Sequence, residues 1–160
     1  DMTHNLIWAE MLTKNGREKF TLEQMGYGYR TSVLKRGEIQ AIVLSALLKL
    51  KNSTKEEVSV KIDQFSERRK ATQPPGASMG SMFKNPEGDF AGRLIEAAGL
   101  KGTRIGTAEI STLHGNFFIN HGETKADDIR ALIHLVQSTV KEKFNVKLEL
   151  EVELVGDWNK

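Results

Sequence analysis

The spacing of apolar residues is clearest in the last third of the chain. From 124 to 144, apolar side chains recur every three or four positions, which predicts an amphipathic helix of about five turns. From 146 to 154, apolar and charged residues alternate, which predicts a strand with one polar face. Glu149, Glu151 and Glu153 fall on that face, and the pattern alone makes them solvated side chains.

The first part of the chain contains a second group of strand and helix patterns. The predicted elements are strands at 5–13, 17–20 and 40–50, a single helical turn at 21–25, and a helix at 54–70. Asn15-Gly16 is typical of a tight hairpin turn. The segment 40–50 is apolar and β-branched at its start, which predicts a mostly buried strand. Ser53 and Thr54 are candidate N-caps, with Glu56 and Glu57 at capping-box spacing, and one apolar stripe follows on the helix.

A Pro- and Gly-rich segment, 73–76, divides the chain into two predicted domains, 1–72 and 73–160. Beyond it we expect a short helix that Asp89 caps and Gly99 ends. Its predicted apolar face comprises Phe90, Leu94, Ile95 and Ala98. Strands are predicted at 104–111 and 116–120, and Thr124 and Asp127 form the predicted cap of the last helix. The order of elements indicates two α+β units.

Composition limits the classes of function. The 160 residues carry a formal charge of +2, too small an excess to indicate nucleic-acid binding. The chain has no cysteine, and its four histidines lack paired ligand spacing, so no metal site is predicted. No apolar run reaches membrane-spanning length and no signal-peptide pattern opens the chain, which makes the cytoplasm the expected location.

One loop combines groups that catalysis uses. Within 80–86, Ser81, Lys84 and Asn85 bring a hydroxyl, an ammonium and an amide together, and loops held by rigid elements often carry catalytic groups. Local chemistry alone favours an ordinary turn here, and an ordinary solvated loop residue for Arg30. Neither a Walker loop nor a dinucleotide-binding fingerprint occurs.

Several separated segments nevertheless resemble one family, the UDP-N-acetylenolpyruvoylglucosamine reductases. They are Tyr29-Arg30-Thr31-Ser32, Gly80-Ser81-Met82-Phe83-Lys84-Asn85-Pro86, the block 91–106, His114-Gly115-Asn116-Phe117 and the segment 148–156. The resemblance covers nearly the whole chain. It implies that 1–72 is the later part of a FAD-binding α+β domain and 73–160 a small α+β substrate-binding domain, whose last strand returns to the flavin. The resemblance further implies that the family's N-terminal flavin-binding segment lies outside these 160 residues.

The resemblance also implies a reaction and roles for residues. NADPH reduces FAD, and the flavin then reduces UDP-N-acetylglucosamine enolpyruvate to UDP-N-acetylmuramate for peptidoglycan synthesis. Ser81 is the implied proton donor, and Arg30 and Glu151 stabilise the intermediate at the carboxylate, with Arg30 also beside the flavin. The implied substrate contacts are Tyr29, Lys84, Asn85 and Lys101.

Two other functions remain open from the residues. The chain could be a non-catalytic module that binds a nucleotide sugar, because a reductase without its flavin segment would behave in this way. It could also be a structural α+β interaction domain, which its ordinary composition allows. By itself the chain is expected to hold little FAD and to be inactive, with a UDP-sugar and the missing segment as its partners.

Overall fold

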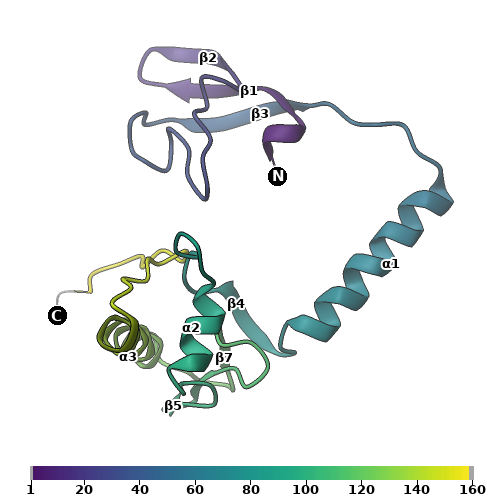
Figure 1. Ribbon diagram of the computed structural model, residues 1–160. Helices are drawn as coiled ribbons and strands as arrows, with labels where there is room; N and C mark the ends of the chain where they lie inside the picture. Colours follow the sequence, from purple (N-terminus) through teal and green to yellow (C-terminus); the bar gives the residue numbers. More distant parts are fainter. Residues whose placement is uncertain (1, 159–160) are drawn as a thin grey trace. The chain divides into compact units, whose positions relative to one another are not determined.

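The computed structural model describes residues 2–158, and the chain divides into two compact units, 1–58 and 59–160. Both units combine antiparallel strands with helical segments, so the α+β prediction is confirmed (Figure 1). No helix among the described residues is long and apolar enough to span a bilayer. The predicted domain boundary between 72 and 73 stays a prediction.

The first unit is built on a three-stranded antiparallel sheet in the order β2-β1-β3. Its elements are the 3₁₀ helix η1 (Met2–His4), β1 (Leu6–Thr13), β2 (Gly16–Thr21) and β3 (Ile42–Leu48). The predicted hairpin is confirmed: Thr13 lies opposite Gly16, and the Asn15 amide donates to Thr13 Oγ1 at 3.0 Å. Gly16 has φ 110°, a conformation that favours glycine and explains its place in the turn.

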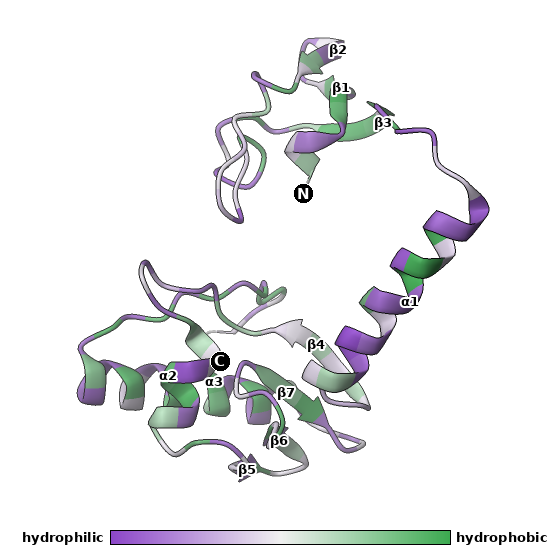
Figure 2. Cartoon of the chain, turned by 45° about the vertical axis from the view of Figure 1, so that its right-hand side comes forward, coloured by the Kyte–Doolittle hydropathy of each residue, from purple (hydrophilic) through white to green (hydrophobic). Residues whose placement is uncertain are grey.

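The prediction of a mostly buried strand at 40–50 is wrong. The core of this unit is small and consists of Leu6, Ala9, Met11 and Met25, whereas every residue of β3 is exposed. Ile42, for example, keeps 65% of its surface. β3 forms the edge of the sheet, and no other described segment covers its apolar side chains. Figure 2 colours this strand as hydrophobic.

Helix α1 (Lys55–Thr72) begins where the sequence predicts. The Thr54 hydroxyl accepts from the Glu57 amide at 3.2 Å, and the Glu57 carboxylate accepts from the Thr54 amide at 3.4 Å, which is a capping box. The helix has no buried residue. Its apolar stripe therefore stays exposed, with Phe65 at 66%.

The second unit has a four-stranded antiparallel sheet in the order β4-β7-β6-β5, with two helices. Its elements are β4 (Ala77–Ser81), α2 (Ala91–Ala97), β5 (Arg104–Ile105), β6 (Ala108–Ile110), β7 (Phe117–Asn120) and α3 (Ala126–Phe144). Helix α3 packs on β5, β6 and α2. The core is formed largely by Met82, Phe83, Leu94, Ile95, Ile110, Phe118, Leu132, Ile133, Val136, Val140 and Leu148.

The predicted strand at 104–111 is in fact a tight hairpin of β5 and β6. Ile105 pairs with Ala108, and Gly106 occupies the turn with φ 57°. A Cβ on Gly106 would lie 2.4 Å from a carboxylate oxygen of Asp128, so a larger residue in this turn would have to displace that side chain. The sequence pattern did not reveal the interruption, because apolar residues continue on both sides of it.

Both helix N-termini in the second unit differ from prediction by a residue. At α2 the N-cap residue is Phe90, and the Ala91 amide donates to Asn85 Oδ1 at 3.1 Å, so Asn85 takes the role predicted for Asp89. At α3 the Lys125 amide donates to Asp128 Oδ2 at 3.3 Å, one position after the predicted Thr124 and Asp127 pair. Gly99 does end α2, with φ 79°.

The predicted strand at 146–154 is wrong in form, although its apolar residues do face the core. Only Leu150 makes a bridge, opposite Phe83. Leu148 is buried, and Val146, Leu150 and Val152 pack partly against the core. Within the described part of the chain this segment pairs only with Phe83, so the alternating pattern gives a docked extended segment rather than a sheet strand.

Candidate active site

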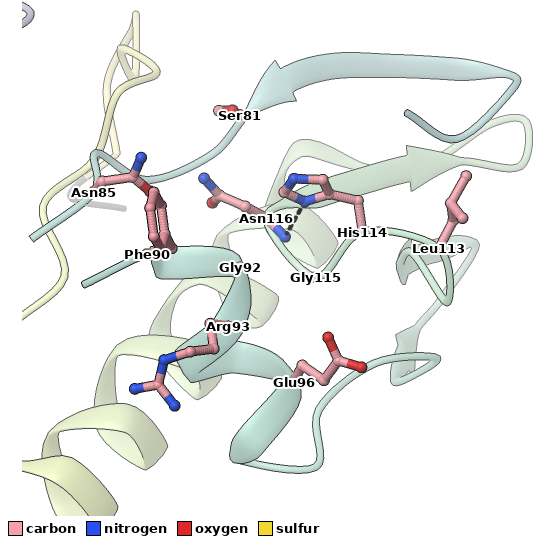
Figure 3. A pocket seen from close by; sticks show the side chains of 10 residues that line it. All are labelled: Ser81, Asn85, Phe90, Gly92, Arg93, Glu96, Leu113, His114, Gly115 and Asn116. Carbon is pink, nitrogen blue, oxygen red and sulfur yellow. Dashed lines mark hydrogen bonds between the residues drawn. The ribbon is translucent and has the colours of Figure 1, made fainter. Parts of the chain in front are cut away.

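A cavity of about 420 Å³ lies where β4, α2 and the turn between β6 and β7 meet (Figure 3). Ser81 is the last residue of β4, and the Ser111 hydroxyl holds the turn by accepting from the Leu113 and His114 amides at 3.1 and 3.2 Å. The cavity is lined by Ser81, Asn85, Phe90, Gly92, Arg93, Glu96, Leu113, His114, Gly115 and Asn116. The site therefore combines hydroxyl, amide, imidazole and charged groups.

Asn116 fixes the backbone that follows Ser81. Its side-chain Oδ1 accepts from the Phe83 amide at 2.9 Å, and its Nδ2 donates to the Phe83 carbonyl at 2.8 Å. Its own carbonyl accepts from the Met82 amide at 2.9 Å. Asn116 is only 3% exposed, and its side chain satisfies both backbone groups of Phe83, two residues beyond the end of β4.

The segment around Glu151 holds the other edge of the same backbone. The Glu151 amide donates to the Met82 carbonyl at 2.9 Å, and the Lys84 amide donates to the Glu149 carbonyl at 2.8 Å. A salt bridge of 3.1 Å between Lys84 Nζ and Glu149 Oε2 lies beside these bonds. The backbone of Glu151 is thus tied to the residue next to Ser81.

His114 is held with a defined tautomer. The Asn116 amide donates to His114 Nδ1 at 3.2 Å, so the ring proton is on Nε2. Burial lowers the pKa of His114, and the positive charge of Lys101 lowers it further, which favours the neutral ring. The ring packs edge-on against Phe117 at a centroid distance of 4.9 Å. A Cβ on Gly92 would lie 2.9 Å from His114 Cε1, so glycine allows this close approach.

The charged groups near the cavity are paired with one another. Arg93 makes a two-pronged ion pair with Asp89, and hydrogen bonds from Arg93 and from the Phe90 amide lower the pKa of Asp89 to about 2. Lys101 Nζ lies 3.1 Å from Glu96 Oε1. The rim therefore offers charged hydrogen-bonding groups, but each charge has a partner of the opposite sign.

The structure brings together part of the predicted site. Ser81 and Asn85 line the cavity directly. Lys84 and Lys101 do not line it, and each binds a glutamate next to the site. Glu151 reaches the site through its backbone, as described above.

Tyr29 and Arg30 belong to the first unit and form the tip of a two-residue turn there. The Gly28 amide donates to the Thr31 carbonyl at 3.1 Å, and the reverse bond is 3.3 Å. Arg30 has φ 55°, and its guanidinium lies 5.5 Å from the centre of the Tyr29 ring. A left-handed conformation at a residue other than glycine is often retained at functional sites. The joint action of Arg30 with Ser81 and Glu151 stays a prediction.

Sequence reasoning assigned no role to several residues of the cavity. His114 and Asn116 belong to the His114-Gly115-Asn116-Phe117 motif, and this motif could have identified them as residues of the site. The sequence offered no signal for Phe90, which was predicted to be in the core but is 66% exposed.

The fold and the cavity define a class of protein: an α+β protein with a cavity of mixed polar and apolar lining at the end of a sheet strand. The family described as UDP-N-acetylenolpyruvoylglucosamine reductase, C-terminal domain, matches residues 71–155. The chain therefore belongs to the UDP-N-acetylenolpyruvoylglucosamine reductase family.

Individual relatives agree with this assignment. A reductase of this name from Chloroflexus aggregans is 45% identical over 97% of this chain and 54% of its own length. One from Bacillus licheniformis is 39% identical over 98% of this chain and 86% of its own length. The crystal structure of the Thermus caldophilus reductase aligns with a TM-score of 0.80 and 40% identity, over 95% of this chain and 53% of that one. The chain spans about half the length of most of these relatives.

Proposed function

We propose that this chain provides the substrate-binding part of a UDP-N-acetylenolpyruvoylglucosamine reductase, acting with NADPH and FAD in cytoplasmic peptidoglycan synthesis. The product is UDP-N-acetylmuramate. The observation that carries the proposal is the position of Ser81, which lines the cavity while both edges of the following backbone are held by hydrogen bonds. Membership of the family supports the substrate class.

Reduction of the enolpyruvyl double bond adds a hydride to one carbon and a proton to its neighbour. We assign the proton to the Ser81 hydroxyl. A serine is a weak acid, so its position relative to the carbon must be fixed, and preorganised donors must stabilise the oxygen that loses the proton. Hydrogen bonds at Met82, Phe83 and Lys84 provide that fixed backbone.

The substrate carboxylate requires positive charge while the intermediate forms. We assign this role to Arg30, whose planar guanidinium can bind a carboxylate through two hydrogen bonds, together with Glu151. Tyr29, Asn85, Lys84 and Lys101 are the proposed substrate contacts. For the two lysines this requires the ligand to compete with Glu149 and Glu96, which now bind them.

Among the residues that the structure describes, we propose only a partial FAD site. The cavity of about 880 Å³ in the first unit is bordered by two carboxylates, Glu18 and Glu38, and by one ammonium, Lys14. This arrangement does not suit an anionic diphosphate, and the sequence lacks a glycine-rich phosphate loop. We therefore propose Arg30 as the contribution of this chain to a flavin site that the other half of a full-length family member completes.

A pair of measurements with Ser81→Ala tests the proposal. We expect calorimetric titration of this chain with UDP-N-acetylglucosamine enolpyruvate to show binding, and Ser81→Ala to retain it within about twofold, because the lost group acts on the transition state. In a full-length enzyme made by joining the N-terminal half of the Chloroflexus aggregans relative to this chain, the same change should slow flavin reoxidation by substrate at least about 100-fold. Flavin reduction by NADPH should change little.

Ser78→Ala, on the same strand but outside the cavity, is the matched control. Equal loss in both half-reactions would contradict the assignment of Ser81 as proton donor. Because the chain spans about half the length of most relatives, a second function remains open, that of a non-catalytic nucleotide-sugar-binding fragment. Binding by the chain without turnover by the joined enzyme would favour this second function.

A further inference from the structure

Phe90 presents an aromatic ring to solvent at the edge of the cavity. Two-thirds of its surface (66%) is exposed, whereas Leu94 and Ile95 in the same segment are buried. Its backbone is extended, with φ −117° and ψ 128°, because it is the N-cap of α2. This conformation directs the residue away from the buried face of the helix.

The position of Phe90 is fixed by its neighbours. Its amide donates to Asp89 Oδ1 at 2.7 Å, its carbonyl accepts from the Leu94 amide at 3.1 Å, and the next amide, that of Ala91, donates to Asn85 Oδ1. In Figure 3 the ring stands beside the Asn85 side chain at one end of the cavity, opposite Leu113. An exposed ring on a rigid backbone loses little conformational freedom when a ligand covers it.

Charge near this ring favours a neutral partner. The Arg93 guanidinium is neutralised by Asp89, and Glu96 is neutralised by Lys101. An anionic group gains little at such a place, whereas a flat uncharged ring gains dispersion and stacking energy on the aromatic face.

We propose that Phe90 is the stacking surface for the uracil base of the nucleotide sugar, while the rest of the ligand occupies the cavity. This inference rests on the proposed function, because the nucleotide is part of the proposed substrate. Phe90 is then a binding residue that contributes affinity through the flat face of the base, without hydrogen bonds.

The test uses the 160-residue chain with UMP, UDP and inorganic pyrophosphate as separate ligands. We expect Phe90→Ala to weaken UMP and UDP binding about tenfold and to leave pyrophosphate binding unchanged. Phe90→Tyr, which keeps the ring, should stay within about twofold of the parent. In NMR spectra, the uracil H5 and H6 signals should shift upfield with the parent chain and with Phe90→Tyr, but not with Phe90→Ala.

Phe65→Ala is the matched control, because Phe65 is the same residue type with the same exposed fraction of 66% and does not line this cavity. If Phe90→Ala binds UDP as tightly as the parent, or weakens pyrophosphate equally, the stacking role is overturned while the proposed function stands. If the parent chain binds neither UDP nor UDP-N-acetylglucosamine enolpyruvate, the substrate-binding function fails and the inference fails with it. Thermal unfolding of each variant identifies any loss that arises from misfolding.

Discussion

At the scale of single residues, the site depends on polar side chains that replace missing backbone partners. Asn116 is the main case, because its amide satisfies the amide and the carbonyl of Phe83, which is itself fully buried. A buried peptide group without a partner costs free energy, so this position requires both a donor and an acceptor. Asn85 acts similarly for the first amide of α2.

We predict that Asn116→Leu, which is apolar and of similar size, lowers the free energy of unfolding by about 3 kcal/mol, because it leaves the two Phe83 groups without partners. For Asn116→Asp, the loss in free energy of unfolding relative to the parent chain should become smaller as pH falls toward 4. A protonated carboxyl group can again donate to the Phe83 carbonyl. Urea unfolding at several pH values measures both effects.

Asn52→Leu in an exposed loop is the matched control and should change stability by less than about 0.5 kcal/mol. An Asn116→Leu variant as stable as this control would show that the Phe83 groups do not need the amide.

At the scale of elements, the hairpin of β5 and β6 carries a buried carboxylate that links three strands. Glu109 on β6 is 7% exposed and lies between Arg104 of β5, with a guanidinium contact of 2.5 Å, and His121 just after β7, with an imidazole contact of 2.6 Å. Burial acts to raise the pKa of Glu109, but the hydrogen bonds from His121 and Arg104 hold it below its usual value.

A lowered pKa of Glu109 in the folded state predicts the direction of a pH effect. The ionised form adds stability above the unfolded pKa, near 4.5, and this contribution is lost as pH falls through the lower folded pKa. Glu109→Gln should cost about 1–3 kcal/mol at pH 7 and make stability less dependent on pH in the acid range. Chemical denaturation between pH 3 and 7 measures this.

Glu56→Gln, at an exposed position of α1, is the matched control. If Glu109→Gln and Glu56→Gln give the same dependence of stability on pH, the contacts of Glu109 with Arg104 and His121 do not stabilise the fold.

At the scale of the whole molecule, the second unit has a core that does not depend on α1. All buried apolar residues of that core follow Ser81, and α1 contributes none among the described residues. We predict that residues 73–160 fold alone, with a cooperative thermal transition and a melting temperature within about 8 °C of the value for the same unit in the full chain. Circular dichroism and NMR measure this. A broad transition without dispersed NMR signals would contradict the prediction and would place the start of the folding unit before residue 73.

Local sequence patterns determined many of the secondary-structure elements of this protein. The Asn15-Gly16 hairpin, the capping box of Thr54 and Glu57, and the apolar period of α3 depend on neighbouring residues, so the sequence by itself specified them. The motifs around Ser81 and His114 likewise indicated the family and two walls of the cavity.

Other features depend on contacts between distant residues, which no local pattern contains. The exposure of β3 and of Phe90, the interruption at Gly106 and the docking of 146–154 beside Phe83 each follow from what another segment does or does not cover. The part played by Asn116 was hidden for the same reason, because its partner Phe83 lies 33 positions away. Sequence therefore fixed the local elements and the chemistry available, and only the tertiary structure decided which side chains meet around Ser81.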